Sequence, residues 1–186
     1  MRIKNIEKLL KRTKTIVTMP DPEQRILWFS DGAVYVPLFD FSVLIQQQIF
    51  TLLNIPVDQV DKFLYSESTL PEDFNFTETD QNEELLERSE ILLTFGGWTL
   101  EPLMTAGGII YLSTDDLKSF EKEDENIHLY CRLTPEGAPY VAVKAGMFLK
   151  GLIMPKTEVV TPMLSNVLHY LATATDNTIK KAIEKE

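Results

Sequence analysis

The stretch that decides the fold is GIIYLSTDDLKSFEKEDENIHLYCRLTPEGAPYVAVKAGMFLKGLIMP, residues Gly108 to Pro155. Its first apolar run, residues 109–112, is typical of a strand. Ser113-Thr114-Asp115-Asp116 follows, in which a hydroxyl is followed three residues later by a carboxylate, the pattern of a capping box at a helix start. Asp115 and Asp116 then lie where a helix N-terminus favours negative charge. This part therefore predicts a strand followed by a short helix that ends near Glu123.

The second half of the same stretch predicts three strands. In residues 127–133, IHLYCRL, the apolar side chains alternate with His128, Tyr130 and Arg132, which is typical of a half-buried strand. Thr134-Pro135-Glu136-Gly137 fits a type I turn, because proline suits its second position. Residues 139–145 and 147–154 supply two further strands, so the predicted order is β-α-β-β-β.

The N-terminal part predicts a helix and a hairpin. Apolar residues recur at helical spacing over residues 3–13, with lysines and arginines between them. A β-branched run over residues 15–19 predicts a strand. In RILWFSDGAVYVPL, residues 25–38, the dipeptide Asp31-Gly32 separates two apolar runs and suits a two-residue hairpin turn in which both positions have φ > 0.

The middle of the chain changes character and predicts a division into lobes. A helix capped by Ser42 is expected over residues 43–53, ending near Pro56. Residues 66–90 then carry nine acids and one arginine, which indicates an acidic connector. We therefore expect an N-terminal lobe over residues 1–65 and a C-terminal lobe over residues 91–186, which closes with a helix opening at Thr161-Pro162.

Composition narrows the class of protein. The chain has 186 residues, 44% of them hydrophobic and 25% charged, which predicts an ordinary globular protein of one or two domains. It holds no apolar run of the ~20 residues that cross a bilayer and no secretory signal pattern. The single cysteine, Cys131, excludes an intrachain disulfide. Together these features predict a cytoplasmic protein without a membrane partner.

The charge is distributed unevenly. The formal net charge is −10, which argues against a generally nucleic-acid-coating surface. Residues 1–14 nevertheless carry six basic groups and only one acid, Glu7. Contact with the DNA backbone is therefore expected only through the first helix, and we assign it to five side chains: Lys4, Lys8, Lys11, Arg12 and Lys14. There are two alternatives to DNA contact for this helix: its basic face is only solvated, or it docks on an acidic partner or on the acidic residues 66–90.

The segments IIYLS (109–113), TDDLKSFEK (114–122), IHLYCRL (127–133) and MFLKGLIMP (147–155) resemble a domain of the bacterial DNA polymerase sliding clamp. In that family a strand leads into a short helix, strands meander after it, and the last strand commonly ends in Met-Pro. KNIEKLLKRTK and RILWFSDGAVYVPL are similar to a shortened second copy. The resemblance implies a non-enzymatic, clamp-like protein that forms a homo-oligomer and contacts DNA phosphates through helices. Residues 115–124 carry five acids and two lysines, so it assigns that contact to the first helix.

No group of residues in the sequence predicts catalysis, a metal or a cofactor. The acidic pairs at Asp115-Asp116 and Glu123–Glu125 are explained by helix capping and solvation. His128 and His169 lack partners at metal-ligand spacing. Cys131 falls on the apolar face of its strand and is expected to be a buried structural thiol.

These observations predict an α+β protein with a mostly antiparallel sheet and several short helices. The predicted function is a non-enzymatic binding protein, a clamp-like accessory of DNA replication or recombination. One alternative is a protein–protein interaction module of a phage or mobile element that does not contact DNA. Another is an enzyme with an unfamiliar site.

Overall fold

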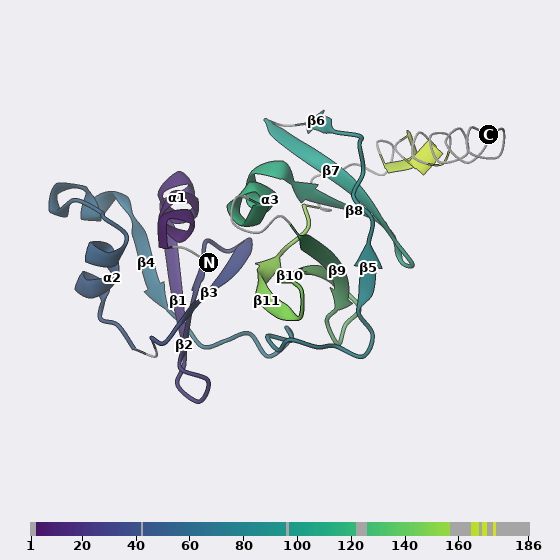
Figure 1. Cartoon of the computed structure of the whole chain (residues 1–186). Helices are drawn as coiled ribbons and strands as arrows, with labels where there is room; N and C mark the ends of the chain where they lie inside the picture. Colours follow the sequence, from purple (N-terminus) through teal and green to yellow (C-terminus); the bar gives the residue numbers. More distant parts are fainter. Residues whose placement is uncertain are drawn as a thin grey trace.

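The computed structural model describes residues 3–41, 43–95, 97–121 and 126–156, together with 165–167, 169–170 and 173. Within these residues the protein is α+β, with short helices and a mostly antiparallel arrangement of strands, as predicted. The strands of the described residues form an eight-stranded sheet and a three-stranded sheet (Figure 1).

The N-terminal segment folds as predicted into a helix and a meander. Helix α1 (Ile3–Thr13) is followed by β1 (Thr15–Asp21), β2 (Ile26–Ser30) and β3 (Val34–Phe39). The three strands pair antiparallel in order, which confirms the predicted hairpin between β2 and β3.

The turn of this hairpin differs from the two-residue form expected. The connection spans residues 31–33, and of Asp31 and Gly32 only Gly32 has a positive φ, of 94°. Asp31 Oδ1 instead accepts hydrogen bonds from the backbone N–H groups of Ala33 and Val34, at 3.0 and 2.9 Å. The aspartate therefore satisfies donors of the turn with its side chain and needs no left-handed backbone.

The next segment extends the sheet at the β1 edge. Helix α2 (Gln46–Leu52) is shorter than predicted and begins after Ile45, whose N–H donates to Gln48 Oε1; Ser42 lies outside the described residues. A 3-10 helix, η1 (Val57–Lys62), follows, and β4 (Leu64–Glu67) then pairs with β1 in parallel.

The chain then crosses to the opposite edge. Strand β5 (Glu84–Leu86) pairs antiparallel with a strand of the C-terminal part, while β6 (Leu93–Phe95), β7 (Trp98–Thr105) and β8 (Gly108–Ser113) form the three-stranded sheet. Helix α3 (Thr114–Glu121) follows β8 directly.

The last strands are β9 (Ile127–Leu133), β10 (Pro139–Ala145) and β11 (Phe148–Ile153), paired antiparallel in order. The predicted turn before β10 is present, because the N–H of Gly137 donates to the carbonyl of Thr134 at 2.8 Å. From residue 108 to 153 the chain order is thus strand, helix and three strands, although β8 belongs to the smaller sheet. The predicted C-terminal helix lies mostly outside the described residues.

The strand order of the large sheet is β4-β1-β2-β3-β11-β10-β9-β5. Its centre is the antiparallel pair β3 and β11, so both predicted lobes contribute to one sheet. The segments α1-β1-β2-β3 and α3-β9-β10-β11 each consist of a helix followed by three strands. In the sheet the strands of the second segment follow those of the first in reverse order, as expected for two copies related by an approximate two-fold axis through the sheet.

Each face of the large sheet is covered by different parts of the chain. On one face, buried side chains of α1 and α3 share a core with inward residues of the strands; among them are Ile6, Leu9, Leu10, Leu117, Phe120, Phe29, Val36, Val141 and Ile153. On the other face, Leu70, Phe74 and Phe76 pack on Trp28 and Tyr140. We call residues 68–83, which supply this second cover, the strap.

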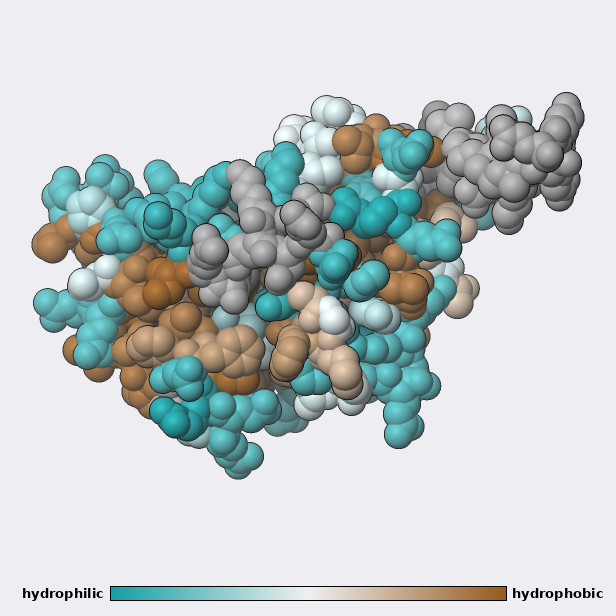
Figure 2. All heavy atoms as spheres, viewed as in Figure 1, coloured by the Kyte–Doolittle hydropathy of each residue, from teal (hydrophilic) through white to brown (hydrophobic). Residues whose placement is uncertain are grey.

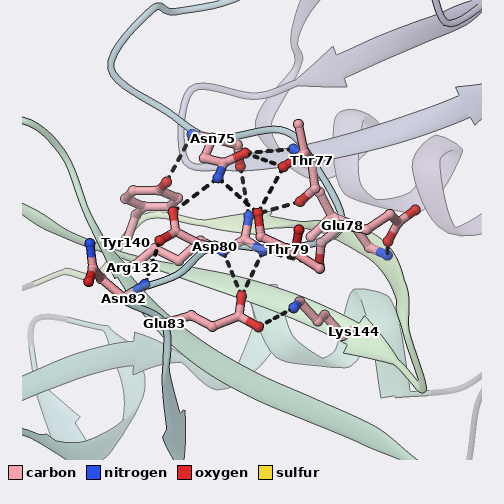
Figure 3. Close-up of polar contacts among 11 residues, drawn as sticks. Asn75, Thr77, Glu78, Thr79, Asp80, Asn82, Glu83, Arg132, Tyr140 and Lys144 are labelled. Carbon is pink, nitrogen blue, oxygen red and sulfur yellow. Dashed lines mark hydrogen bonds and ion pairs between the residues drawn. The ribbon is translucent and has the colours of Figure 1, made fainter.

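A buried network of charges holds the strap (Figure 3). The Arg132 guanidinium is fully buried and donates to the carbonyls of Asn75 and Thr77 at 2.8 and 3.0 Å. It also binds Glu83 Oε2 at 2.8 Å, and Lys144 Nζ donates to Glu83 Oε1. Glu83 of the predicted connector thus pairs with two buried cations, one of β9 and one of β10. Arg132 was predicted on a polar face of its strand, and the strap covers that face.

Candidate nucleic-acid interface

Helix α1 presents its basic side chains to solvent because its apolar stripe is used by the core. Ile6, Leu9 and Leu10 are at most 2% exposed and pack against the sheet. Side chains at intervening positions therefore point away from the sheet, and Lys4 and Lys8 are exposed. The structure thus places two of the five predicted cations on the outer surface of α1.

Lys11 is engaged by neighbouring acceptors. Its ammonium group donates to Glu7 Oε1 at 2.8 Å and to the carbonyl of Asn54 at 2.8 Å. Asn54 in turn donates from its side chain to Glu7 Oε2 at 3.1 Å. The hydrogen bond from Lys11 is the main cause that lowers the pKa of Glu7, so this carboxylate stays charged beside the lysine. Lys11 therefore ties α1 to the end of α2.

Arg12 is engaged more strongly, in a partly buried cluster of charges. It donates to Asp116 Oδ1 at 2.5 Å and lies 3.9 Å from Asp31 Oδ2. Both carboxylates have side chains at most 4% exposed. Lys156 Nζ lies 3.7 Å from Asp116 Oδ2. Burial raises the pKa of Asp116, an effect that Lys156 and Arg12 oppose. Arg12 thus joins α1 to the β2–β3 turn and to α3.

Lys14 is exposed and ends the helix. Its backbone is left-handed, with φ of 56°, and its carbonyl accepts a hydrogen bond from the N–H of Leu64 at 2.8 Å. Lys14 lies between the C-terminal end of α1 and the first residue of β1, beyond the helical turn that carries Lys8.

The packing of α1 against α3 leaves a hollow of about 250 Å³ between the two helices. It is lined by Asn5, Lys8, Leu9, Arg12, Asp115, Lys118 and Ser119. The side-chain amide of Asn5 donates to the carbonyl of Ser119 at 3.2 Å and joins the two helices there. Of the described residues, three cations and one carboxylate therefore line the same hollow.

Asp115 is the carboxylate of this hollow. It accepts a hydrogen bond from Lys118 Nζ at 2.9 Å, and both side chains are largely exposed, at 63% and 59%. The pKa of Asp115 is lowered chiefly by that hydrogen bond and, further, by the charges of Lys118, Arg12 and Lys8. Cations from both helices are thus close enough to act on one exposed carboxylate.

The sequence analysis missed Lys118 because the segment that holds it is acidic overall. Only the tertiary structure shows that Asp116 is buried against Arg12 and that Lys118 faces α1. Helical spacing offered one usable signal. Leu117 and Phe120 mark the buried stripe of α3, which leaves Asp115 and Lys118 on a different part of the helix surface.

Within the described residues, no group of three or more histidine, cysteine, aspartate or glutamate side chains is placed to hold a metal ion. His128 and His169 are exposed, and Glu123–Glu125 lie outside the described residues. Cys131 is 4% exposed, which confirms that it is buried, and burial raises the pKa of its thiol.

Comparison with family models, with curated proteins and with solved structures yields no match for this chain. In the part of the chain that the structure describes, no helix combines the length and apolar character that crossing a bilayer requires.

Proposed function

We propose that the chain is a non-enzymatic binding protein that contacts the phosphate backbone of DNA through the α1–α3 surface. The observation that carries the proposal is the hollow between the two helices, which brings Lys118 of α3 beside Lys8 and Arg12 of α1. Lys4 lies exposed one turn before Lys8. Phosphate contact of this kind needs clustered cations and reads no base sequence.

The architecture that we propose is clamp-like, as in an accessory of DNA replication or recombination. Two features support it: the repeated element order with mirrored strand order, and the placement of both helices on one face of the sheet. In sliding clamps such helices face the DNA. Four of the five predicted cations take distinct roles in this proposal, and Lys14 takes neither. Lys4 and Lys8 make the contact, while Lys11 and Arg12 hold the helix in place.

The test is a titration of fluorescein-labelled duplex DNA, read by anisotropy between 20 and 200 mM salt. We expect the logarithm of the affinity to fall linearly with the logarithm of the salt concentration, at about 0.9 per phosphate contacted. Lys8→Glu should weaken binding at the lowest salt about five-fold or more, because one attraction becomes a repulsion. Lys62→Glu, the same change on exposed η1, is the matched control and should alter the affinity less than about two-fold. Absence of wild-type binding at low salt would exclude the proposal.

A second candidate is a protein–protein interaction module without DNA contact. From the last residue of β3 to the residue before α2, every second position is an exposed apolar residue: Phe39, Phe41, Val43 and Ile45, at 38–70%. Figure 2 shows hydrophobic surface gathered over the region of α2 and the neighbouring strands. A partner that docks there should be lost from Phe41→Ser combined with Val43→Ser, and retained by Lys8→Glu.

A further inference from the structure

We infer that the hollow between α1 and α3 is an anion site occupied by the protein's own Asp115, which an incoming phosphate group displaces from Lys118. The inference rests on the proposed function, because the phosphate belongs to the DNA backbone contacted by the same surface. It adds a regulatory feature to that site, namely an internal carboxylate that competes with the ligand.

The position of Asp115 supports this competition. Among the described residues that line the hollow, its carboxylate is the one acidic group, and Lys8, Arg12 and Lys118 line it with Asp115. The hydrogen bond from Lys118 spans 2.9 Å between two side chains that are both more than half exposed. An exposed pair of this kind contributes little to folding and separates readily. Lys118 is therefore free to exchange one anionic partner for another.

The cations differ in how they would respond to a phosphate. Arg12 already binds the buried Asp116, so its guanidinium is held in place at one end of the hollow and its charge is largely neutralised there. Lys8 and Lys118 are exposed and come from different helices, so a phosphate between them would bridge α1 and α3. Among the described residues that line the hollow, displacement of Asp115 leaves Lys8, Lys118 and the ion-paired Arg12 without a carboxylate beside them.

Asp115→Asn tests the inference, in the same anisotropy assay with fluorescein-labelled duplex DNA. Asp58→Asn is the matched control, because it removes one exposed acid from η1 and changes the net charge by the same amount. We expect Asp115→Asn to tighten binding about three- to ten-fold at low salt, and Asp58→Asn to change it less than about two-fold. Combined with Lys118→Ala, the gain from Asp115→Asn should shrink to less than about two-fold, because the cation that it releases is gone.

The outcomes separate this inference from the function on which it rests. If wild type binds DNA and Asp115→Asn changes that affinity by less than two-fold, the proposed competition is overturned while the DNA contact still stands. Equal tightening by Asp115→Asn and Asp58→Asn also overturns it, because net charge alone would then explain the gain. If neither wild type nor Asp115→Asn shows salt-sensitive binding, both the competition and the proposed DNA contact are excluded. Circular dichroism and thermal unfolding of each variant confirm that the fold is retained.

Discussion

Replacing Arg132 with methionine should release the strap from the sheet. The guanidinium is fully buried, and its hydrogen bonds to strap carbonyls and to Glu83 are lost together (Figure 3). Removing one partner of a buried ion pair lowers the free energy of unfolding by about 3–5 kcal/mol. The lower end applies, because Glu83 keeps Lys144 and the carbonyl of the exposed Thr77 can bind water. We therefore expect the free energy of unfolding to fall by about 3 kcal/mol.

The loss can be measured by urea unfolding, followed by tryptophan fluorescence; of the two tryptophans, Trp28 packs against Phe76 of the strap. For a chain of this size, a loss of about 3 kcal/mol corresponds to a melting temperature lower by roughly 6–12 °C. Arg25→Met makes the same substitution at an exposed turn position and should change stability by less than about 0.5 kcal/mol. Glutamate-specific proteolysis should also cut the strap of Arg132→Met faster than that of wild type. A loss below about 1 kcal/mol, with unchanged proteolysis, would refute the argument that Arg132 anchors the strap.

Three further predictions concern stability and reactivity. Burial acts to raise the pKa of Glu83, but hydrogen bonds from Lys144 and Arg132 outweigh it and hold this pKa below its ordinary 4.5. The stabilising contribution of Glu83 is therefore complete above that value and disappears as pH falls through the lower folded-state pKa. Glu83→Gln should flatten the dependence of the urea midpoint on pH between about 5 and 3, and an unchanged slope would contradict this. Gly151→Ala should lower the free energy of unfolding in urea by about 3 kcal/mol, because a Cβ there would lie 2.3 Å from the carbonyl oxygen of Tyr35. The control Gly107→Ala should be as stable as wild type, since its Cβ would meet no atom closer than 3.7 Å. The Cys131 thiol should react with a thiol-specific chromogenic reagent only after unfolding, since it is buried and its pKa is raised; rapid reaction of the native protein would show that β9 is more open than described.

Much of the local structure was predictable because it depends on near neighbours in the chain. Alternation in residues 127–133 identified β9, and helical spacing of apolar residues identified α1. The turn at residues 134–137 follows from proline and glycine at their favoured positions. The hairpin at Asp31-Gly32 was predicted correctly, although the side chain of Asp31 altered the form of its turn.

The candidate site was predictable only in part. Exposed lysines of α1 follow from the position of the apolar stripe, so Lys4 and Lys8 could be found. Arg12 sits on the same helix and looks equivalent in sequence, yet it binds Asp116, 104 positions away. Pairings over such separations depend on how elements pack, and no local pattern encodes them.

The sequence by itself determined α1 and most strands in the first and last thirds of the chain, because backbone preference and side-chain periodicity act over a few residues. It did not determine β4 and β5, which extend into the predicted connector and depend on pairing with β1 and β9. Only the tertiary structure decided which charges are solvated and which are internal. Arg132 and Lys144 lie on strand faces that would meet water in an isolated hairpin, and the strap buries them. A buried charge requires a specific partner, and the folded chain alone brings that partner within hydrogen-bond distance.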